Sequence, residues 1–443
     1  MVKELRSDSI PFSPTKHNHV FVKFAVSFLL VGLAFRLLVS DSIRLPSVVE
    51  KPTFGEDKAE TSVASQPIHQ QQVSSSSDFQ NNRSRTSQTE KCDLFIGDWI
   101  PDTSGPFYTN QSCLAIEGHQ NCMKNGRSDS GYLYWRWNPR DCELPRFNAD
   151  KFLHLMRNKS WGFIGDSISR NHVQSLFCIL SQVEPGIEVY HDEEYRSKIW
   201  HFPSHNFTLS VIWTPFLLKA EIFEDMNGVA SSEIQLHLDK LDEKWTEQYK
   251  KFDYAVIAGG KWFLKTAIYH ENNTVTGCHY CPGKNFTELG FDYAYRKALQ
   301  MILQFIVNSG HEASVFIRTS TPDHFENGEW FSGGTCNRTV PFKEGEVDMT
   351  DVDRVMRDIE LEEFEKATPL GSKNGVILNL LDTTRLSLLR PDGHPGPYRN
   401  VQPFAENKNA KVQNDCLHWC LPGPIDSWND LIMEMIQHDG THR

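Results

Sequence analysis

The chain has 443 residues, of which 39% are hydrophobic and 12% aromatic, and its formal net charge is −12. This length allows one large domain with extensions, or two to three modest domains. Residues 1–90 hold 10 basic and 9 acidic side chains, whereas residues 91–443 hold 35 and 48. An acidic body has no electrostatic reason to gather on phosphate backbones, so we do not expect a nucleic-acid partner. The sequence contains neither a P-loop nor a dinucleotide-binding glycine motif, and a neutral substrate suits this surface better.

The first predicted element is a membrane segment. The stretch VFVKFAVSFLLVGLAFRLLV at 20–39 is about one bilayer thickness of helix, and its charges, Lys23 and Arg36, lie near its ends, where they can snorkel. A cleaved signal peptide is the alternative, but no small-x-small cleavage site follows. Basic residues before the span predict a cytosolic tail at 1–19, a signal anchor at 20–40 and a lumenal remainder. A Ser/Gln-rich, disordered stem is expected over 41–90.

Cysteines and glycosylation sequons agree with a lumenal body. All ten cysteines lie beyond residue 90, and their even number predicts a disulfide framework whose connectivity the spacing does not give. They are Cys92, Cys113, Cys122, Cys142, Cys178, Cys278, Cys281, Cys336, Cys416 and Cys420. A zinc site formed by Cys278-His-Tyr-Cys281 and Cys416-x3-Cys420 is the less favoured alternative. Sequons occur at Asn82, Asn110, Asn158, Asn206, Asn272, Asn285 and Asn337, which completes a type II, Golgi-like layout.

The body is predicted to be an α/β domain behind a small irregular one. Residues 91–147 are dense in Cys, Trp, Gly and Pro and indicate a disulfide-stapled subdomain. Residues 148–443 then alternate apolar strands at 161–166, 253–258, 313–318 and 375–381 with helices after 166, at 291–308, at about 349–367 and at 425–438. This alternation predicts a mostly parallel sheet covered on both faces, which is a three-layer α/β fold with its chemistry at the carboxyl ends of the strands.

Gly165-Asp166-Ser167 follows the first of these strands and opens a helix. A serine there projects its hydroxyl into the crevice, and the unpaired N–H groups of a first helical turn favour a developing oxyanion. An ordinary helix cap explains an isolated Gly-Asp-Ser equally well.

Asp415-Cys-Leu-His418 precedes the last helix. Serine needs an adjacent base to become a nucleophile, and that base needs an acceptor that fixes its tautomer. An aspartate three residues before a histidine can meet both needs from one loop, which the flanking Cys416 and Cys420 would hold rigid. An ordinary exposed turn is the alternative for this motif taken alone.

These motifs together resemble a family. Gly165-Asp-Ser with a carboxy-terminal Asp415-x-x-His418 is the pattern of SGNH/GDSL-type esterases. The blocks Cys92-Asp-Leu-Phe-Ile-Gly-Asp-Trp99, Tyr134-Trp-Arg-Trp137, Gly165-Asp-Ser-Ile-Ser-Arg-Asn171, Glu326-Asn-Gly-Glu-Trp330, Gly333-Gly-Thr-Cys-Asn337 and Asp415-Cys-Leu-His-Trp-Cys-Leu-Pro-Gly423 are similar to those of the plant trichome-birefringence-like proteins. These are Golgi polysaccharide O-acetyltransferases with a PC-esterase domain. The resemblance covers residues 92–443 and implies an SGNH-like fold.

The resemblance also implies roles for individual residues. Ser167 would take the acetyl group, His418 would act as base and then acid, and Asp415 would orient His418. One departure is Lys261, which stands before Trp262 where many relatives carry histidine and would put a fixed cation beside the site. Further candidates for the oxyanion or the substrate are Asp166, Arg170, Asn171, Gly260, Lys261 and Trp419. Trp419 is the tryptophan that we expect to stack on a sugar ring; Trp135, Trp137, Trp262 and Trp330 are more readily explained by packing.

The resemblance therefore implies acetyl transfer to a hemicellulose in the Golgi. The sequence of residues 261–272 looks closest to that of members that act on xyloglucan, at a side-chain galactose. Glucomannan or xylan as acceptor, a polysaccharide acetylesterase, and a non-catalytic wall-polymer-binding protein are the alternatives. The acetyl donor is acetyl-CoA or an acetyl carrier, used as co-substrate and supplied by a transporter or carrier protein in the Golgi membrane. No bound cofactor or metal is required for such a triad.

Overall fold

The computed structural model describes residues 92–224 and 230–440, which belong to one compact unit, Ser87–Arg443. The predicted cytosolic tail, signal anchor and stem at 1–90 lie outside the described residues. In the described ranges, none of the helices combines the length and the hydropathy that crossing a bilayer would take.

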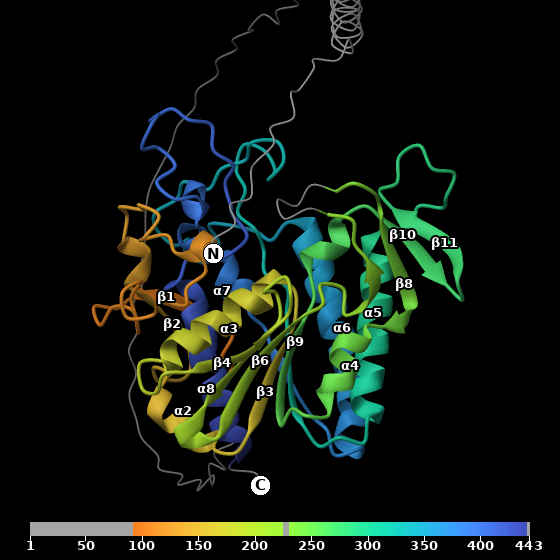
Figure 1. The fold of residues 1–443 in the computed structure, drawn as a ribbon, viewed down its shortest axis with the longest axis horizontal. Helices are drawn as coiled ribbons and strands as arrows, with labels where there is room; N and C mark the ends of the chain where they lie inside the picture. Colours follow the sequence, from red (N-terminus) through yellow and green to blue (C-terminus); the bar gives the residue numbers. More distant parts are fainter. Residues whose placement is uncertain (1–91, 225–229, 441–443) are drawn as a thin grey trace, which may run out of the picture. The chain divides into compact units, whose positions relative to one another are not determined.

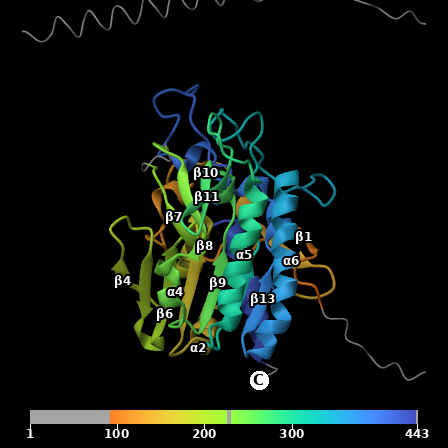
Figure 2. The same cartoon turned by 90° about the vertical axis from the view of Figure 1, so that its right-hand side faces the viewer.

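The centre of the molecule is a seven-stranded sheet with the order β13-β12-β9-β3-β6-β5-β4. The strands from β13 to β6 run parallel, and β5 and β4 continue the sheet antiparallel. Their bounds are β3 Ser160–Gly165, β4 Ile187–His191, β5 Lys198–Phe202, β6 Phe207–Trp213, β9 Tyr254–Ala258, β12 Ser314–Arg318 and β13 Ile377–Leu381. The predicted strands are confirmed as β3, β9, β12 and β13, whereas the antiparallel edge was not predicted. Figure 2 shows this sheet from β4 at one edge to β13 at the other.

Helices cover both faces of the sheet, so the three-layer prediction is confirmed (Figure 1). One face carries α2 Ala149–Leu155, α3 Ser167–Leu180 and α8 Ser427–Gly440, and the other carries α4 Glu243–Tyr249, α5 Gly290–Asn308 and α6 Asp351–Lys373. Helix α6 runs beyond the predicted end at 367 and contains Pro369. Short helical segments occur at α7 Thr384–Leu388 and at the 3-10 turns η1 Gly118–Gln120, η2 Gly131–Leu133, η3 Pro203–His205, η4 Lys261–Leu264, η5 Pro391–Gly393, η6 Pro397–Arg399 and η7 Pro424–Asp426.

The parallel strands are apolar on both faces because each side is packed against helices. In β3, Phe163 belongs to the hydrophobic cluster under α3 and α8, and its neighbour Ile164 belongs to the cluster under α5 and α6. In β12, Phe316 likewise belongs to the cluster under α3 and α8, and Ile317 to the cluster under α5 and α6. Side chains alternate between faces along a strand, so a doubly covered strand is a continuous apolar run, which is why these strands were predictable.

Two smaller sheets surround this core. Strands β1 Gly97–Pro101 and β2 Trp135–Pro139 pair antiparallel in the cysteine-rich segment. Their Trp99 and Trp137 join the same hydrophobic cluster as α3 and α8, so the segment shares the main core. The second sheet, of order β11-β10-β8-β7, was not predicted. Its strands are β7 Leu218–Glu221, β8 Ile234–Leu241, β10 Ala267–Glu271 and β11 Thr274–His279.

Six of the seven sequons lie in the described ranges. Asn158, Asn206, Asn272, Asn285 and Asn337 are exposed and Asn110 is half-buried, while Asn82 lies outside the described residues. Glycan attachment stays a prediction, and the exposure of these side chains is compatible with it.

Candidate active site

Ser167 is the first residue of α3, directly after the carboxyl end of β3. Asp166 caps the helix, and its Oδ1 accepts the Ile168 N–H at 2.9 Å. Gly165 is required at this turn, because a Cβ there would lie 2.2 Å from the Ala258 carbonyl oxygen and 2.5 Å from Ser169 Oγ. The sharp turn leaves Ser167 half-buried at the helix amino terminus, where its N–H has no intrahelical acceptor.

Asp415 and His418 form a hydrogen-bonded pair from one loop, as predicted. His418 Nδ1 lies 2.9 Å from Asp415 Oδ2 and 3.1 Å from Oδ1. Asp415 Oδ1 also accepts the His418 N–H at 3.0 Å. Burial alone would lower the pKa of His418, but the Asp415 carboxylate outweighs it and holds that pKa above its usual value. The same pairing overcomes the effect of burial on Asp415 and holds the pKa of its carboxyl far below the usual range.

The other ring nitrogen of His418 is free. Its Nε2 is buried and has no hydrogen-bond partner in the described part of the chain, so no bond joins it to the Ser167 hydroxyl. Because the carboxylate holds Nδ1 as the donor, Nε2 presents a lone pair. A buried acceptor without a partner is costly unless a substrate or nucleophile uses it.

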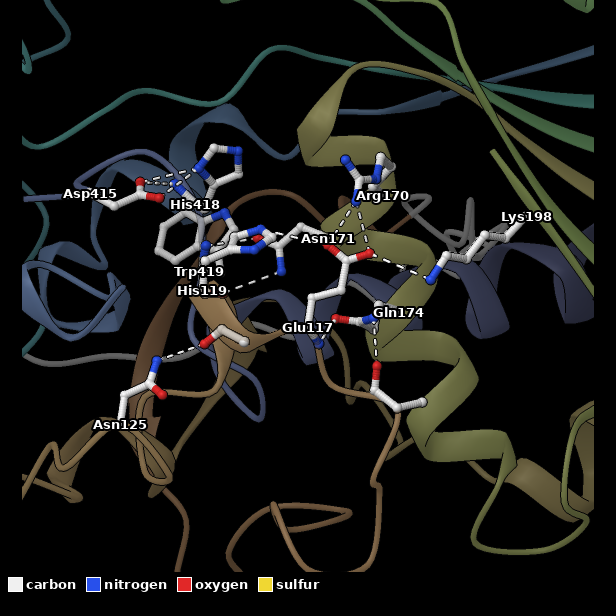
Figure 3. Close-up of polar contacts among 12 residues, drawn as sticks. Glu117, His119, Asn125, Arg170, Asn171, Gln174, Lys198, Asp415, His418 and Trp419 are labelled. Atoms are coloured by element: carbon white, nitrogen blue, oxygen red, sulfur yellow. Dashed lines mark hydrogen bonds and ion pairs between the residues drawn. The ribbon is translucent and has the colours of Figure 1, made fainter. Parts of the chain in front are cut away.

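Asn171 joins the serine helix to the histidine loop. Its Oδ1 accepts the Trp419 N–H at 2.7 Å and its Nδ2 donates to the Trp419 carbonyl at 3.2 Å (Figure 3). Ser167 precedes Asn171 by four residues and therefore lies on the same face of α3. His418 directly precedes Trp419. The structure thus holds the loop of the base candidate against the helix that begins at the nucleophile candidate, and it commits the Asn171 amide to that loop instead of to an oxyanion.

Two disulfides hold the histidine loop on both sides. Cys416 pairs with Cys336 and Cys420 pairs with Cys122. The other pairs are Cys92–Cys142, Cys113–Cys178 and Cys278–Cys281, so all ten cysteines are bonded and the predicted framework is confirmed. Because Cys278 and Cys281 share a disulfide, they offer no thiolates to zinc.

The cysteine-rich segment supplies residues that sequence reasoning missed. Glu117 binds the Arg170 guanidinium with both oxygens, at 2.7 and 2.8 Å, so Arg170 is engaged in an ion pair (Figure 3). The His119 ring lies edge-on to His418, with 6.1 Å between centroids. Burial, with the nearby His418, lowers the pKa of His119 to about 4. Neither residue belongs to a recognisable motif; the only available signal was the nearby Cys122, whose partner the spacing did not give.

Gly260 and Lys261 lie at the next strand end, after β9. A Cβ on Gly260 would lie 3.8 Å from Asp166 Oδ2, so Gly260 adjoins the turn that holds Ser167. Lys261 Nζ lies 2.5 Å from Asp353 Oδ1 and 3.1 Å from Asp323 Oδ2. These two carboxylates neutralise the cation, and although burial opposes them they raise the pKa of Lys261.

Trp419 does not face a ligand, and the expectation that it stacks on a sugar ring is wrong. Its side chain is 0% exposed and stacks on His394, with 4.3 Å between ring centroids. Trp137 is buried, and Trp135 and Trp262 are half-buried, whereas Trp330 is 43% exposed. Packing therefore accounts for Trp137 as expected, and Trp330 is the tryptophan of this group that a polymer could reach.

Two family models match the chain between residues 90 and 435. Residues 144–435 match the model of PC-Esterase, the GDSL/SGNH-like acyl-esterase family found in Pmr5 and Cas1p. The chain belongs to this family. Residues 90–143, which include the cysteine-rich segment, match the model of the PMR5 N-terminal domain.

Curated relatives cover most of the chain. It is 58% identical to protein trichome birefringence-like 25 of Arabidopsis thaliana over 98% of this chain and 96% of that protein. It is 43% identical to xyloglucan O-acetyltransferase 1 of Populus trichocarpa over 82% of this chain and 86% of the relative, and 44% identical to xyloglucan O-acetyltransferase 1 of Arabidopsis thaliana over 78% and 80%. The resemblance read from the sequence motifs is confirmed.

Proposed function

We propose that the chain is an O-acetyltransferase that transfers acetyl groups to hydroxyls of a cell-wall hemicellulose, most favourably the side-chain galactose of xyloglucan. Relatives that bear the name xyloglucan O-acetyltransferase support the reaction class and the acceptor. The observation that carries the proposal is the buried, unpartnered Nε2 of His418, whose Nδ1 is held by Asp415, beside the helix that begins at Ser167.

The proposed reaction has two steps through one serine. Ser167 Oγ attacks the acetyl carbonyl carbon of the donor while its proton passes to His418 Nε2, and the leaving group of the donor takes that proton as the bond breaks. A sugar hydroxyl then attacks the acetyl-serine carbonyl carbon and gives its proton to Nε2. As the bond from that carbon to Ser167 Oγ breaks, Nε2 returns the proton to Oγ, which restores the serine hydroxyl and the neutral His418. The oxyanion of each step would be stabilised by the N–H of Ser167 and by the backbone of Gly260. Acetyl-CoA or an acetyl carrier is the proposed donor.

The acceptor would lie along an exposed aromatic pair. Trp330 and Phe331 are 43% and 73% exposed, and their rings meet edge to face with 6.0 Å between centroids. Their loop is tied to the catalytic loop by the Cys336–Cys416 disulfide and by the Gln413 amide, which donates to the Trp330 carbonyl at 3.2 Å. Aromatic faces stack on the apolar faces of pyranose rings, so this pair offers the polymer a rigid platform beside the site.

Trp330→Ala should raise the KM for polymer with little change in kcat. Trp330→Phe keeps an aromatic ring at this position and should restore the KM of the wild type.

Hydrolysis is the second candidate, because the matching family is described as acyl-esterases. Water and a sugar hydroxyl compete for the same acyl-enzyme, and the outcome depends on how well the site positions the sugar. An experiment must therefore follow acetyl gain and acetyl loss together.

The test uses the full chain with acetyl-CoA and de-acetylated xyloglucan, glucomannan and xylan oligomers, read by mass spectrometry beside Ser167→Ala. Serine-dependent gain of one acetyl mass on xyloglucan is the expected result, and gain on another oligomer would reassign the acceptor. Serine-dependent loss of acetyl from acetylated polymer, with no gain, would make the protein an esterase. An effect that Ser167→Ala leaves intact would favour a binding protein.

A type II position in the Golgi membrane is proposed for the full chain. The five disulfides and the exposed sequons support an oxidising, glycosylating compartment. Protease protection of glycosylated residues 91–443 in intact vesicles, with cleavage of the amino-terminal tail, is the expected result.

A further inference from the structure

A pair of hydrogen-bonded histidines lies directly behind His418. His394 follows η5 and is 3% exposed, and its Nδ1 lies 2.7 Å from the His418 carbonyl oxygen. His324 lies in the loop after β12, and its Nε2 lies 2.8 Å from the Leu388 carbonyl oxygen. The two rings face each other through His324 Nδ1 and His394 Nε2, which are 2.7 Å apart.

A count of protons shows that two neutral rings do not satisfy this arrangement. Carbonyl oxygens only accept, so His394 Nδ1 and His324 Nε2 must both carry hydrogen. A neutral imidazole has one N–H, so in two neutral rings the facing nitrogens would both be lone pairs at 2.7 Å. One more proton between them turns that repulsion into an N–H···N hydrogen bond.

The surroundings oppose a second extra proton and act on the first in both directions, so the first is inferred from the facing nitrogens. Burial lowers the pKa of each ring, and a charge on His324 lowers the pKa of His394 further, so a doubly charged pair is disfavoured. Several carboxylates attract a single positive charge on the pair, and one guanidinium opposes it. The charged groups that face the pair are Asp323, Asp353, Asp392, Asp415 and Arg127.

The pair completes the immobilisation of His418. Asp415 holds the His418 ring and its N–H, and His394 holds its carbonyl. His394 also stacks on Trp419, and the Arg127 guanidinium donates to the His394 carbonyl at 2.8 Å. Two neutral rings could form the inner bond only by giving up an outer one, either to His418 or to Leu388.

We propose that His324 and His394 share one proton and act as positioning residues that fix the backbone of His418 through the His394 Nδ1–H. The kinetic part of this inference rests on the proposed acetyl transfer, whereas the proton count does not. As pH rises and the shared proton is lost, the His418 carbonyl contact weakens and kcat falls.

The first test counts protons in the full chain labelled with 15N-histidine. Long-range proton–nitrogen correlation spectra should show three protonated ring nitrogens among the four of this pair at about pH 6. The His324 signals are assigned by their loss in His324→Gln and the His394 signals by their loss in His394→Gln. Two protonated nitrogens would overturn the proposal. This result does not depend on acetyl transfer, so it stands or fails separately from the proposed function.

The second test compares two substitutions of similar size at one position. In His324→Gln, the two amide N–H groups can donate to the Leu388 carbonyl and to His394 Nε2 without any extra proton. In His324→Leu, the His394 lone pair is left buried and unpaired. We expect kcat to fall about tenfold or more in His324→Leu with KM changed less than about twofold, and His324→Gln to keep kcat within about threefold with no alkaline fall. Equal losses in both variants, or no loss in either, would overturn the positioning role.

Discussion

At the scale of single residues, the Asp415 carboxylate serves two functions. Its Oδ1 accepts the N–H groups of Leu417 and His418, at 3.2 and 3.0 Å, and so shapes the loop. Both its oxygens also face His418 Nδ1 and so fix the tautomer of the ring. A substitution that keeps the loop hydrogen bonds of Asp415 but changes the tautomer of His418 therefore tests the role of the tautomer in the reaction.

Asp415→Asn is that substitution. Asparagine keeps an oxygen for the loop N–H groups, but its amide N–H turns toward Nδ1 and forces the hydrogen of His418 onto Nε2. His418 then accepts no proton from Ser167, and we expect kcat to fall roughly 10³- to 10⁴-fold with little change in melting temperature. Rates measured beside Glu406→Gln, an exposed carboxylate nearby in the chain, check this. A loss below about tenfold would contradict the proposed role.

The pH profile provides a second residue-scale prediction. His418 must be neutral to act as base, and Asp415 raises its pKa. Activity should therefore fall with decreasing pH, with an acid limb above about 6.5, the ordinary histidine value. The measurement is kcat/KM against pH. An acid limb at or below the ordinary value would show that His418 is not the base.

Sequence motifs predicted Ser167, Asp415 and His418 because each is determined by a short stretch of chain. Glu117 and His119 reach the site only through the fold, so no local pattern indicated them. Trp419 was misjudged because its neighbour His418 is half-buried, while its own ring lies beneath His394. Adjacency in sequence does not reveal which side of a loop is covered.

At the scale of elements, the turn between β3 and α3 allows almost no additional volume. Gly165→Ala would put a methyl group 2.2 Å from the Ala258 carbonyl oxygen, so the end of β9 or the start of α3 must move. We expect a loss of about 1–3 kcal/mol in the free energy of unfolding and a much larger loss of activity. Denaturant titration measures the first. The matched control is Gly118→Ala, whose Cβ would meet no atom within 4 Å and which should leave stability nearly unchanged.

Some of the strands could be predicted from the sequence and others could not, and the difference lies in how each strand is buried. Strands β3, β9 and β12 were predicted because they are short apolar runs buried on both faces, and β13 was predicted because it is a short apolar run, although most of it is half-buried at the sheet edge. Strand β8 was missed, although its first residues alternate between buried and half-buried. Its sequence, IQLHLDKL, mixes apolar with polar and charged residues, so it contains no continuous apolar run. Strand β4 is exposed throughout and carries no burial pattern to recognise. Which helices cover which face was not predicted either, because it depends on chain crossings.

At the scale of the whole molecule, the buried acid Glu360 should make the free energy of unfolding depend on pH. Glu360 Oε1 accepts the Ser320 N–H at 2.8 Å and the Tyr295 hydroxyl, and its Oε2 has no partner in the described chain. Burial raises the pKa of Glu360 to about 8. The folded protein therefore keeps a proton that the unfolded chain releases above about pH 4.3. Glu360 by itself should make stability fall with rising pH between these values, by about 1.4 kcal/mol per pH unit, and should add no further change above pH 8.

Glu360→Gln resembles the protonated acid and should remove this slope. Unfolding free energies measured from about pH 5 to pH 8 for wild type and variant test it, because their difference should grow with pH. Glu365→Gln, an exposed acid on the same helix, should keep the wild-type slope. Parallel curves for Glu360→Gln and wild type would contradict the prediction.

The Cys122–Cys420 bond joins cysteines 298 residues apart, and the second of them lies two residues after His418. A ribosome adds about 5–20 residues per second, so Cys122 is made on the order of 15–60 s before its partner. Throughout that interval the thiol is open to oxidation with the wrong cysteine. The candidate active site is thus among the last parts of the molecule to become covalently complete, and a disulfide isomerase present during synthesis should raise the yield of active enzyme more than its total yield.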